Sequence, residues 1–116
     1  MMNDNETSTM VITTLDIPKI MARASSRIPS GEHLRVCIYG SIEKVEMICT
    51  KSNAPMAYVT LNDQHGSVKV IFFPDVFKTY EAFLLNDNKV SITGMLDVTE
   101  TTSYLIAEII QKKDPE

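Results

Sequence analysis

Hydrophobic and polar positions alternate along two segments in the middle of the chain, residues 56–62 and residues 67–73. A period of two residues is typical of a strand with one buried face. The apolar positions that share this face are Ala57, Val59, Leu61, Val68, Val70 and Phe72. The polar run between the segments is typical of a turn, because Gly66 can adopt positive φ angles. The pattern therefore predicts a β-hairpin with one packed face and one open face.

Three further stretches carry strand patterns, namely residues 33–48, 90–98 and 103–110. Gly40 lies inside the first of these and Gly94 inside the second, and an internal glycine lets a barrel strand coil sharply. We expect Gly40 to let one strand serve two sheets. Pro74 opens a predicted helix that runs to Leu85. The element order β-β-β-α-β-β predicts a mainly β protein, a five-stranded OB-fold barrel with a helix between strands three and four.

The chain before the barrel is predicted to contain one helix. We expect a disordered tail over residues 1–14, an amphipathic helix over residues 15–30 and the OB-fold domain over residues 31–113. Asp16 is suited to cap this helix, and Pro18 is tolerated in its first turn. The apolar positions that form one helical face are Ile17, Ile20, Met21, Ala24 and Ile28.

Basic residues at a spacing of four form a second stripe on this helix: Lys19, Arg23 and Arg27. Such a stripe is ordinarily a solvated face. It is also a candidate second basic face, which would contact phosphates or an acidic partner.

Composition limits the classes of function. The length of 116 residues fits one domain. The net charge of −4 argues against tight, general attraction to nucleic acid. No apolar run approaches the roughly 18 residues of a membrane span, and the polar N-terminus does not resemble a signal peptide. Cys37 and Cys49 lack metal-type spacing and are expected to be reduced thiols, so we expect a cytoplasmic protein without membrane contact.

The open face of the hairpin carries the residues that are suited to single-stranded nucleic acid. Tyr58 can stack on a base, and Lys69 on the neighbouring strand can meet a phosphate. Thr60 and Asn62 are candidate hydrogen-bond partners of bases, although both could simply be solvated and Asn62 could belong to the turn. A plain strand tyrosine and a solvated lysine remain the alternatives for Tyr58 and Lys69.

Three further residues border the same predicted groove. Lys44 and Lys51 flank the first loop, which closes over the ligand in OB domains, and Tyr104 lies near the loop over residues 99–102. Two acids, Glu43 and Glu46, lie near the groove and weaken phosphate binding. Met47 and Ile48 could equally meet a protein.

The hairpin also carries a family resemblance. The segment 57–74, AYVTLNDQHGSVKVIFFP, resembles the OB-fold nucleic-acid-binding domain of the bacterial DNA polymerase III alpha subunit. The matching positions are Thr50, Lys51, Met56, Ala57, Tyr58, Leu61, Asp63, Gly66, Phe73 and Pro74. The anticodon-binding OB domain of aspartyl-type tRNA synthetases is similar but more distant. In that family the aromatic residue that matches Tyr58 stacks on an anticodon base, and a glutamine matches Lys69.

The residues on the open face of the hairpin and the family resemblance together imply a non-catalytic single-stranded DNA-binding protein. The resemblance implies a small accessory subunit that holds template strand for a DNA polymerase or primase supplied in trans during replication. We expect no catalytic residue, no metal, no cofactor and no small-molecule substrate, because the sequence has no phosphate loop, nucleophile elbow or ligand cluster. Two alternatives stay open: a protein–protein interaction module without nucleic-acid binding, and an RNA- or tRNA-binding OB protein.

Overall fold

A computed structural model describes residues 9–26, 33–99 and 102–112. The elements in chain order are β1 (Met10–Val11), the 3-10 helix η2 (Thr14–Asp16), α1 (Ile17–Ser26), β2 (His33–Cys49), β3 (Pro55–Asn62), β4 (Ser67–Phe72), α2 (Pro74–Tyr80), the 3-10 helix η3 (Glu81–Phe83), β5 (Lys89–Val98) and β6 (Ser103–Lys112). Strands β2 to β6 with α2 between β4 and β5 give the predicted order. The prediction of a mainly β, five-stranded OB-fold barrel is confirmed.

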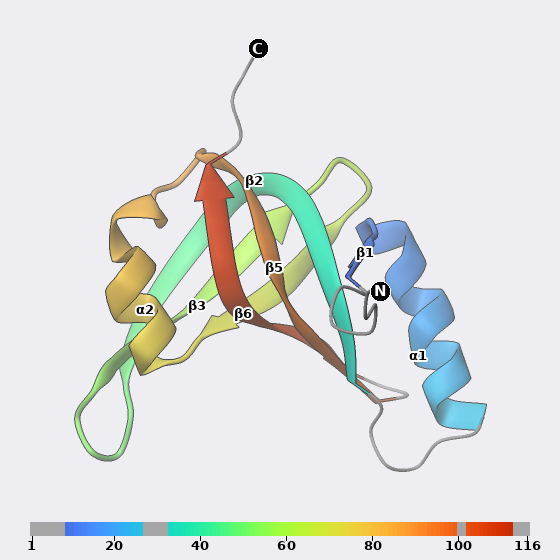
Figure 1. Ribbon diagram of the computed structural model, residues 1–116, viewed down its shortest axis with the longest axis horizontal. Coiled ribbons are helices and arrows are strands. Elements are labelled where there is room, and N and C mark those ends of the chain that lie inside the picture. The colour runs from blue at the N-terminus through green and yellow to red at the C-terminus, as the bar shows by residue number, and fades with distance from the viewer. Residues whose placement is uncertain (1–8, 27–32, 100–101, 113–116) are drawn as a thin grey trace, which may run out of the picture.

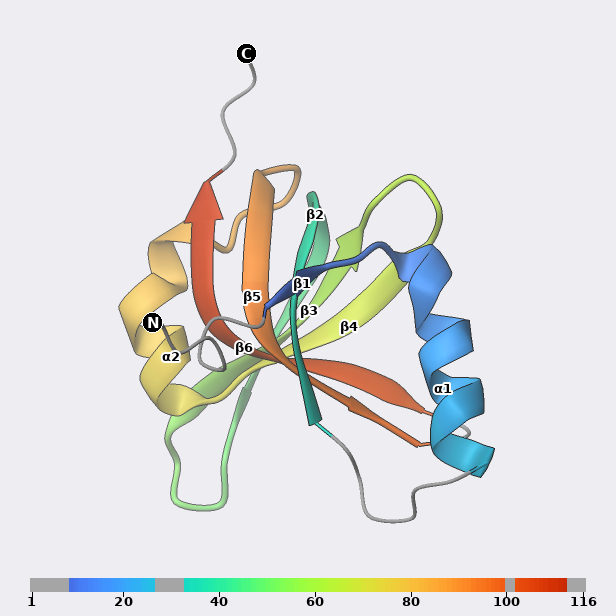
Figure 2. The same ribbon diagram turned by 45° about the vertical axis from the view of Figure 1, so that its right-hand side comes forward.

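The barrel closes because β2 takes part in two ladders. Its first half, residues 33–41, pairs antiparallel with β5, and its second half, residues 41–49, pairs antiparallel with β3. The sheet order β2-β3-β4-β6-β5 therefore returns to β2. Strand β4 runs parallel to β6, while the remaining barrel pairs are antiparallel. The strong coil of β2 around the barrel is visible in Figures 1 and 2.

Gly40 lies at the point where β2 changes partners. The adjacent residue Ser41 is paired both with Asn62 of β3 and with Lys89 of β5. A Cβ atom on Gly40 would lie 2.5 Å from the backbone oxygen of Asn62, closer than any real side chain allows. The predicted role of Gly40, to let one strand serve two sheets, agrees with this geometry.

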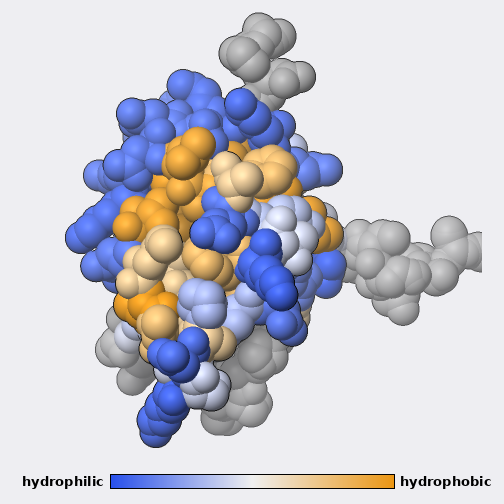
Figure 3. Space-filling model, turned by 90° about the vertical axis from the view of Figure 1, so that its left-hand side faces the viewer, coloured by the Kyte–Doolittle hydropathy of each residue, from blue (hydrophilic) through white to orange (hydrophobic). Residues whose placement is uncertain are grey.

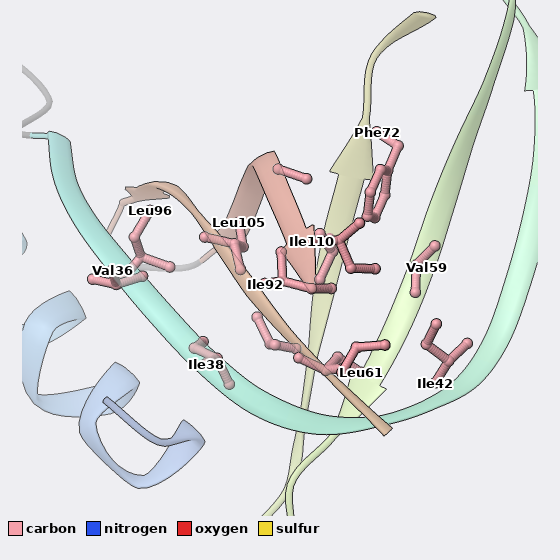
Figure 4. Packing of buried hydrophobic residues seen from close by; sticks show 14 of the residues in the cluster. Val36, Ile38, Ile42, Val59, Leu61, Phe72, Ile92, Leu96, Leu105 and Ile110 are labelled. Atoms are coloured by element: carbon pink, nitrogen blue, oxygen red, sulfur yellow. The ribbon is translucent and has the colours of Figure 1, made fainter. Parts of the chain in front are cut away.

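The core fills the inside of the barrel. The apolar residues predicted for the packed face of the hairpin are all buried, with exposed fractions of 5% or less. The labelled side chains from β2, β3, β4, β5 and β6 point toward one another in Figure 4. Helix α2 closes one end of this core with Phe77 and, just beyond η3, Leu84. The predicted helix over residues 74–85 is therefore a short α-helix followed by a 3-10 turn.

The N-terminal segment corrects the predicted tail. Residues 9–14 are not a disordered extension, because β1 pairs in parallel with Val36 and Cys37 of β2 and the Ile12 N–H donates to the Cys37 carbonyl (3.0 Å). Ile12 and Thr14 are buried against the barrel. A strand of two residues, Met10 and Val11, is too short to show a period of two in the sequence, so the pattern did not reveal it. Residues 1–8 lie outside the described residues.

The helix begins differently from the prediction. The helical segment starts with η2, whose N-cap is Thr13: the Thr13 hydroxyl accepts from the Leu15 N–H (3.2 Å), and the Asp16 carboxylate accepts from the Thr13 N–H (3.0 Å). This reciprocal pair is a capping box. Helix α1 follows, with Ile17 buried in the core cluster and Ile20 packed against it. The predicted helix end at residue 30 lies outside the described residues.

Candidate nucleic-acid interface

Cross-strand pairing brings four of the predicted site residues onto one outer face of β3, β4 and β6. Thr60 lies opposite Lys69, and Lys69 lies opposite Tyr104. Tyr58 lies opposite Ile71, two residues along the same strands and therefore on the same side of the sheet. Cross-strand partners stand on the same side of a sheet, so these side chains share a surface. We refer to Tyr58, Thr60, Lys69 and Tyr104 as the strand face.

The strongest feature of the strand face is the contact between an amine and a ring. The Lys69 Nζ atom lies 5.8 Å from the centroid of the Tyr58 ring, within the range of a cation–π interaction. Lys69 is exposed and Tyr58 is half-buried, so the amine is available to solvent while the ring is held by its neighbours. Ile71 and Ile106, which are paired with each other across β4 and β6, are half-buried and extend the apolar surface beside the ring.

Lys44 occupies a different place from the one predicted. It lies on β2 directly opposite Thr60, within the sheet rather than beside the first loop. Its Nζ atom is 3.6 Å from the Glu46 carboxylate, and Glu46 lies opposite Tyr58. Both side chains are exposed, so the pair contributes little to stability. It does place a carboxylate beside the tyrosine, which lowers the positive potential there.

Lys51 is exposed in the loop that joins β2 and β3. This hairpin end extends beyond the barrel, at the lower left of Figure 1. The loop is closed by the Ala54 N–H, which donates to the Thr50 hydroxyl (3.1 Å), and Asn53 adopts a positive φ angle of 70°. Lys51 is therefore carried by a well-defined turn at one end of the strand face.

Asn62 lies at the opposite end of β3. Its side-chain oxygen accepts from the Gln64 N–H (3.3 Å), as expected of a residue that opens a turn. It also lines a pocket together with residues of β2. Asn62 is thus set apart from the Tyr58 ring, and its alternative interpretation as a turn residue agrees with the structure.

The second basic face can be located only in part. Lys19 is exposed on α1. The side chains of Arg23 and Arg27 lie outside the described residues, so the stripe remains a prediction.

Asp63 holds the N-terminal segment against the β3–β4 turn, a role that the sequence analysis did not predict. Its carboxylate accepts from the Thr14 N–H (2.7 Å), the Thr14 hydroxyl (2.8 Å) and the His65 N–H (3.0 Å). Partial burial raises the pKa of Asp63, but hydrogen bonds from Thr14, His65 and Gly66 outweigh this effect and hold the pKa below its ordinary value. Asp63 therefore ties the N-terminal segment to the β3–β4 turn. We call this contact the Thr14–Asp63 clamp.

The described residues contain neither a metal-binding cluster nor a membrane-spanning helix. Within residues 9–26, 33–99 and 102–112, no three histidine, cysteine or acidic side chains gather as a metal site would require. No helix in the same ranges is long and apolar enough to cross a membrane.

The barrel and its outer face define the class of protein. Residues 36–112 match the family described as OB-fold nucleic acid binding domain, of the tRNA anticodon type. This match covers more than half of the chain, and the protein belongs to this family.

Its sequence relatives agree with the predicted resemblance. The chain is 36% identical over 69 residues to the DNA polymerase III subunit alpha of Staphylococcus aureus (strain MRSA252), covering 60% of this chain and 6% of the relative. It is 32% identical over 73 residues to the DNA polymerase III subunit alpha of Saccharopolyspora erythraea, covering 63% of this chain and 6% of the relative. The chain thus spans about one-sixteenth of the length of these relatives.

Solved structures support the fold. A crystal structure of yeast Stn1 and Ten1 contains a chain that superposes with a TM-score of 0.70 at 12% identity, covering 92% of this chain and 64% of that one. A chain from the S. pombe Stn1–Ten1 complex gives a TM-score of 0.51 at 17% identity, covering 70% of this chain and 60% of that one. At these identities the likeness concerns the barrel alone.

Proposed function

We propose that this protein binds single-stranded DNA, without catalysis, on the strand face. The observation that carries the proposal is the Lys69 amine positioned 5.8 Å from the Tyr58 ring on an exposed sheet surface. A base stacked on the ring would place its phosphate near an amine, which is the combination that single-strand-binding OB domains use. The ring cannot stack on a base that is already paired and stacked within a duplex.

Binding should be weak and local. The net charge is −4, and Glu46 offsets Lys44 beside the ring. We expect dissociation constants in the micromolar range or above, which corresponds to about −8 kcal/mol or less favourable.

Fluorescence anisotropy with labelled oligo-dT and a matched duplex tests the proposal. Replacing Tyr58 with alanine should weaken binding by about 1–3 kcal/mol, whereas Tyr58→Phe should bind nearly as well, because the π-face does the stacking. Equal affinity for single strand and duplex, or full binding by the Tyr58→Ala variant, would show that the strand face is not a single-strand-binding surface. Oligo-rU in the same assay separates DNA preference from RNA preference.

We further propose that the protein works beside a DNA polymerase or primase supplied in trans, in the cytoplasm. The support is the sequence likeness to a segment of DNA polymerase III alpha subunits. A specific observation also favours a protein contact. Met47 and Phe73 are 61% and 46% exposed. Figure 3 shows hydrophobic surface gathered across the side of the molecule that carries α2, bordered by hydrophilic residues.

Co-purification from the source cells tests the partner. We expect a replicative polymerase or primase to be retained by the wild-type protein and lost from a Met47→Ser/Phe73→Ser double variant that still binds oligo-dT. Equal retention of polymerase by both proteins would show that Met47 and Phe73 do not contact the partner.

A further inference from the structure

A pocket of about 600 Å³ lies beside the strand face, on the other side of Asn62. Its volume is within the roughly 300–1,000 Å³ of small-molecule and cofactor sites. Four elements form its walls: the end of β1 with the residues that follow it, β2 around Gly40, the β3–β4 turn and the start of β5 at Lys89. Figures 1 and 2 both show the β3–β4 turn side by side with the segment that leads from β1 into α1.

The pocket repeats the chemistry of the strand face. Tyr39 contributes an aromatic ring that is 45% exposed, and Lys89 contributes an exposed amine. The two strands that carry them are paired here, with Tyr39 opposite Ser91 and Ser41 opposite Lys89. Asn62, Ser41 and His65 add polar groups to the walls.

One acid lines the same pocket, but its oxygens are already used. The Asp63 carboxylate accepts from Thr14 at 2.7 Å and 2.8 Å and from the His65 N–H at 3.0 Å. These donors occupy both oxygens of the carboxylate, which remains negatively charged. The Thr14–Asp63 clamp also fixes the wall contributed by the N-terminal segment, so the pocket is formed before any ligand enters.

The pocket continues the line of β3. Asn62 follows Thr60 by two positions and Tyr58 by four, and a strand rises about 3.3 Å per residue, so Asn62 lies roughly 13 Å from Tyr58 along the backbone of β3. Successive nucleotides of one strand can therefore pass from Tyr58 over Thr60 to Asn62 and reach Tyr39 without leaving the surface.

We propose that this pocket is a second nucleotide subsite, in which Tyr39 stacks on a base and Lys89 meets the adjoining phosphate of the same single strand. The inference rests on the proposed function, because it extends the path of the strand that the Tyr58 face is proposed to hold. It adds a second subsite, on β2 and β5, to the strand face on β3, β4 and β6.

Dependence on oligonucleotide length provides the test. Anisotropy titrations would use oligo-dT from about 4 to about 16 nucleotides, the range of site sizes found for OB folds. Tyr39→Ala should weaken binding of the longest oligonucleotide about tenfold and leave the shortest unchanged, while Tyr39→Phe should match the wild type. Lys89→Ala should flatten the log K versus log salt slope by about 0.7 for the long oligonucleotide only.

Lys78→Ala is the matched control, because Lys78 is an exposed lysine of α2 that does not line the pocket. If Tyr39→Ala and Lys89→Ala bind every length as the wild type does, the second subsite is rejected while the strand face stands. Equal losses at all lengths, accompanied by a lower melting temperature, would show that Tyr39 is structural and would also overturn the proposal. If the wild-type protein binds no oligonucleotide, the proposed function itself fails.

Discussion

Replacing Asp63 with asparagine tests how the N-terminal segment is held on the barrel. The carboxylate uses both oxygens, one for the Thr14 N–H (2.7 Å) and one for the Thr14 hydroxyl (2.8 Å) and the His65 N–H (3.0 Å). An asparagine has only one oxygen, and its NH₂ group cannot accept. One donor of Thr14, a residue only 9% exposed, would then lose its partner.

The magnitude follows from these contacts. A hydrogen bond to a charged group contributes about 1.5–3 kcal/mol, and a buried donor left without an acceptor costs about 1–3 kcal/mol. Asp63 is only half-buried, so the lower part of the range applies. We expect Asp63→Asn to lower the free energy of unfolding by about 2 kcal/mol.

Urea unfolding followed by circular dichroism measures this loss. The control is Asp87→Asn, because Asp87 is an exposed turn residue with φ of 72°, a conformation that asparagine tolerates. The control should change stability by less than about 0.5 kcal/mol. Similar small effects of both substitutions would show that the clamp does not hold the segment.

The same clamp predicts a dependence on pH. The pKa of Asp63 is lower in the folded protein than its ordinary value, so its contribution is complete above the unfolded pKa and is lost as the pH falls through the folded pKa. The stability difference between wild type and Asp63→Asn should therefore be constant near neutrality and shrink below about pH 4. A difference that stays constant into this acid range would contradict the assignment.

Three further predictions concern the barrel, the helix and the charges. Gly40→Ala should lower the melting temperature and cost about 1–3 kcal/mol, because the new Cβ would meet the backbone oxygen of Asn62 at 2.5 Å; unchanged melting would contradict the close approach. Ile17→Ala should cost about 2–4 kcal/mol in chemical unfolding, since Ile17 is 6% exposed within the core cluster, whereas a loss below about 0.5 kcal/mol would mean that α1 is dispensable. Lys69→Ala and Lys51→Ala should each flatten the salt dependence of oligo-dT binding by about 0.7 in the log–log slope, and unchanged slopes in both would place the phosphates elsewhere.

The barrel could be predicted because its physical signals are local. Alternating apolar residues such as Val68, Val70 and Phe72 fix which face of a strand is buried, and all three are at most 5% exposed. Gly40 marked the point where β2 changes partners. The same alternation placed Thr60 and Lys69 on the open face of the hairpin, and the structure pairs them across β3 and β4.

The N-terminal segment could not be predicted because its contacts are distant in sequence. Thr14 and Asp63 are separated by 49 positions, and no periodic pattern connects them. A strand of two residues such as β1 is too short to show alternation. Ile12 and Ile17 are nevertheless buried against the barrel.

Tyr39 was missed for a related reason. The alternation of β2 places it on the outer face, but the sequence does not reveal that the β3–β4 turn and the N-terminal segment meet beside it. Lys44 was placed beside the loop, whereas the bulge between Ile42 and Lys44 sets it opposite Thr60. The surroundings of Tyr39 and the place of Lys44 both depend on contacts between segments distant in sequence, which a local pattern does not reveal.

Backbone amide shifts in NMR spectra, recorded as oligo-dT is added, test the central claim most directly. We predict the largest changes at Tyr58, Thr60, Lys69 and Tyr104, with little change along α2. Matched duplex DNA should leave the spectrum almost unaltered. Changes concentrated on α2, or no changes at saturating oligonucleotide, would contradict the assignment of the strand face as a single-strand-binding surface.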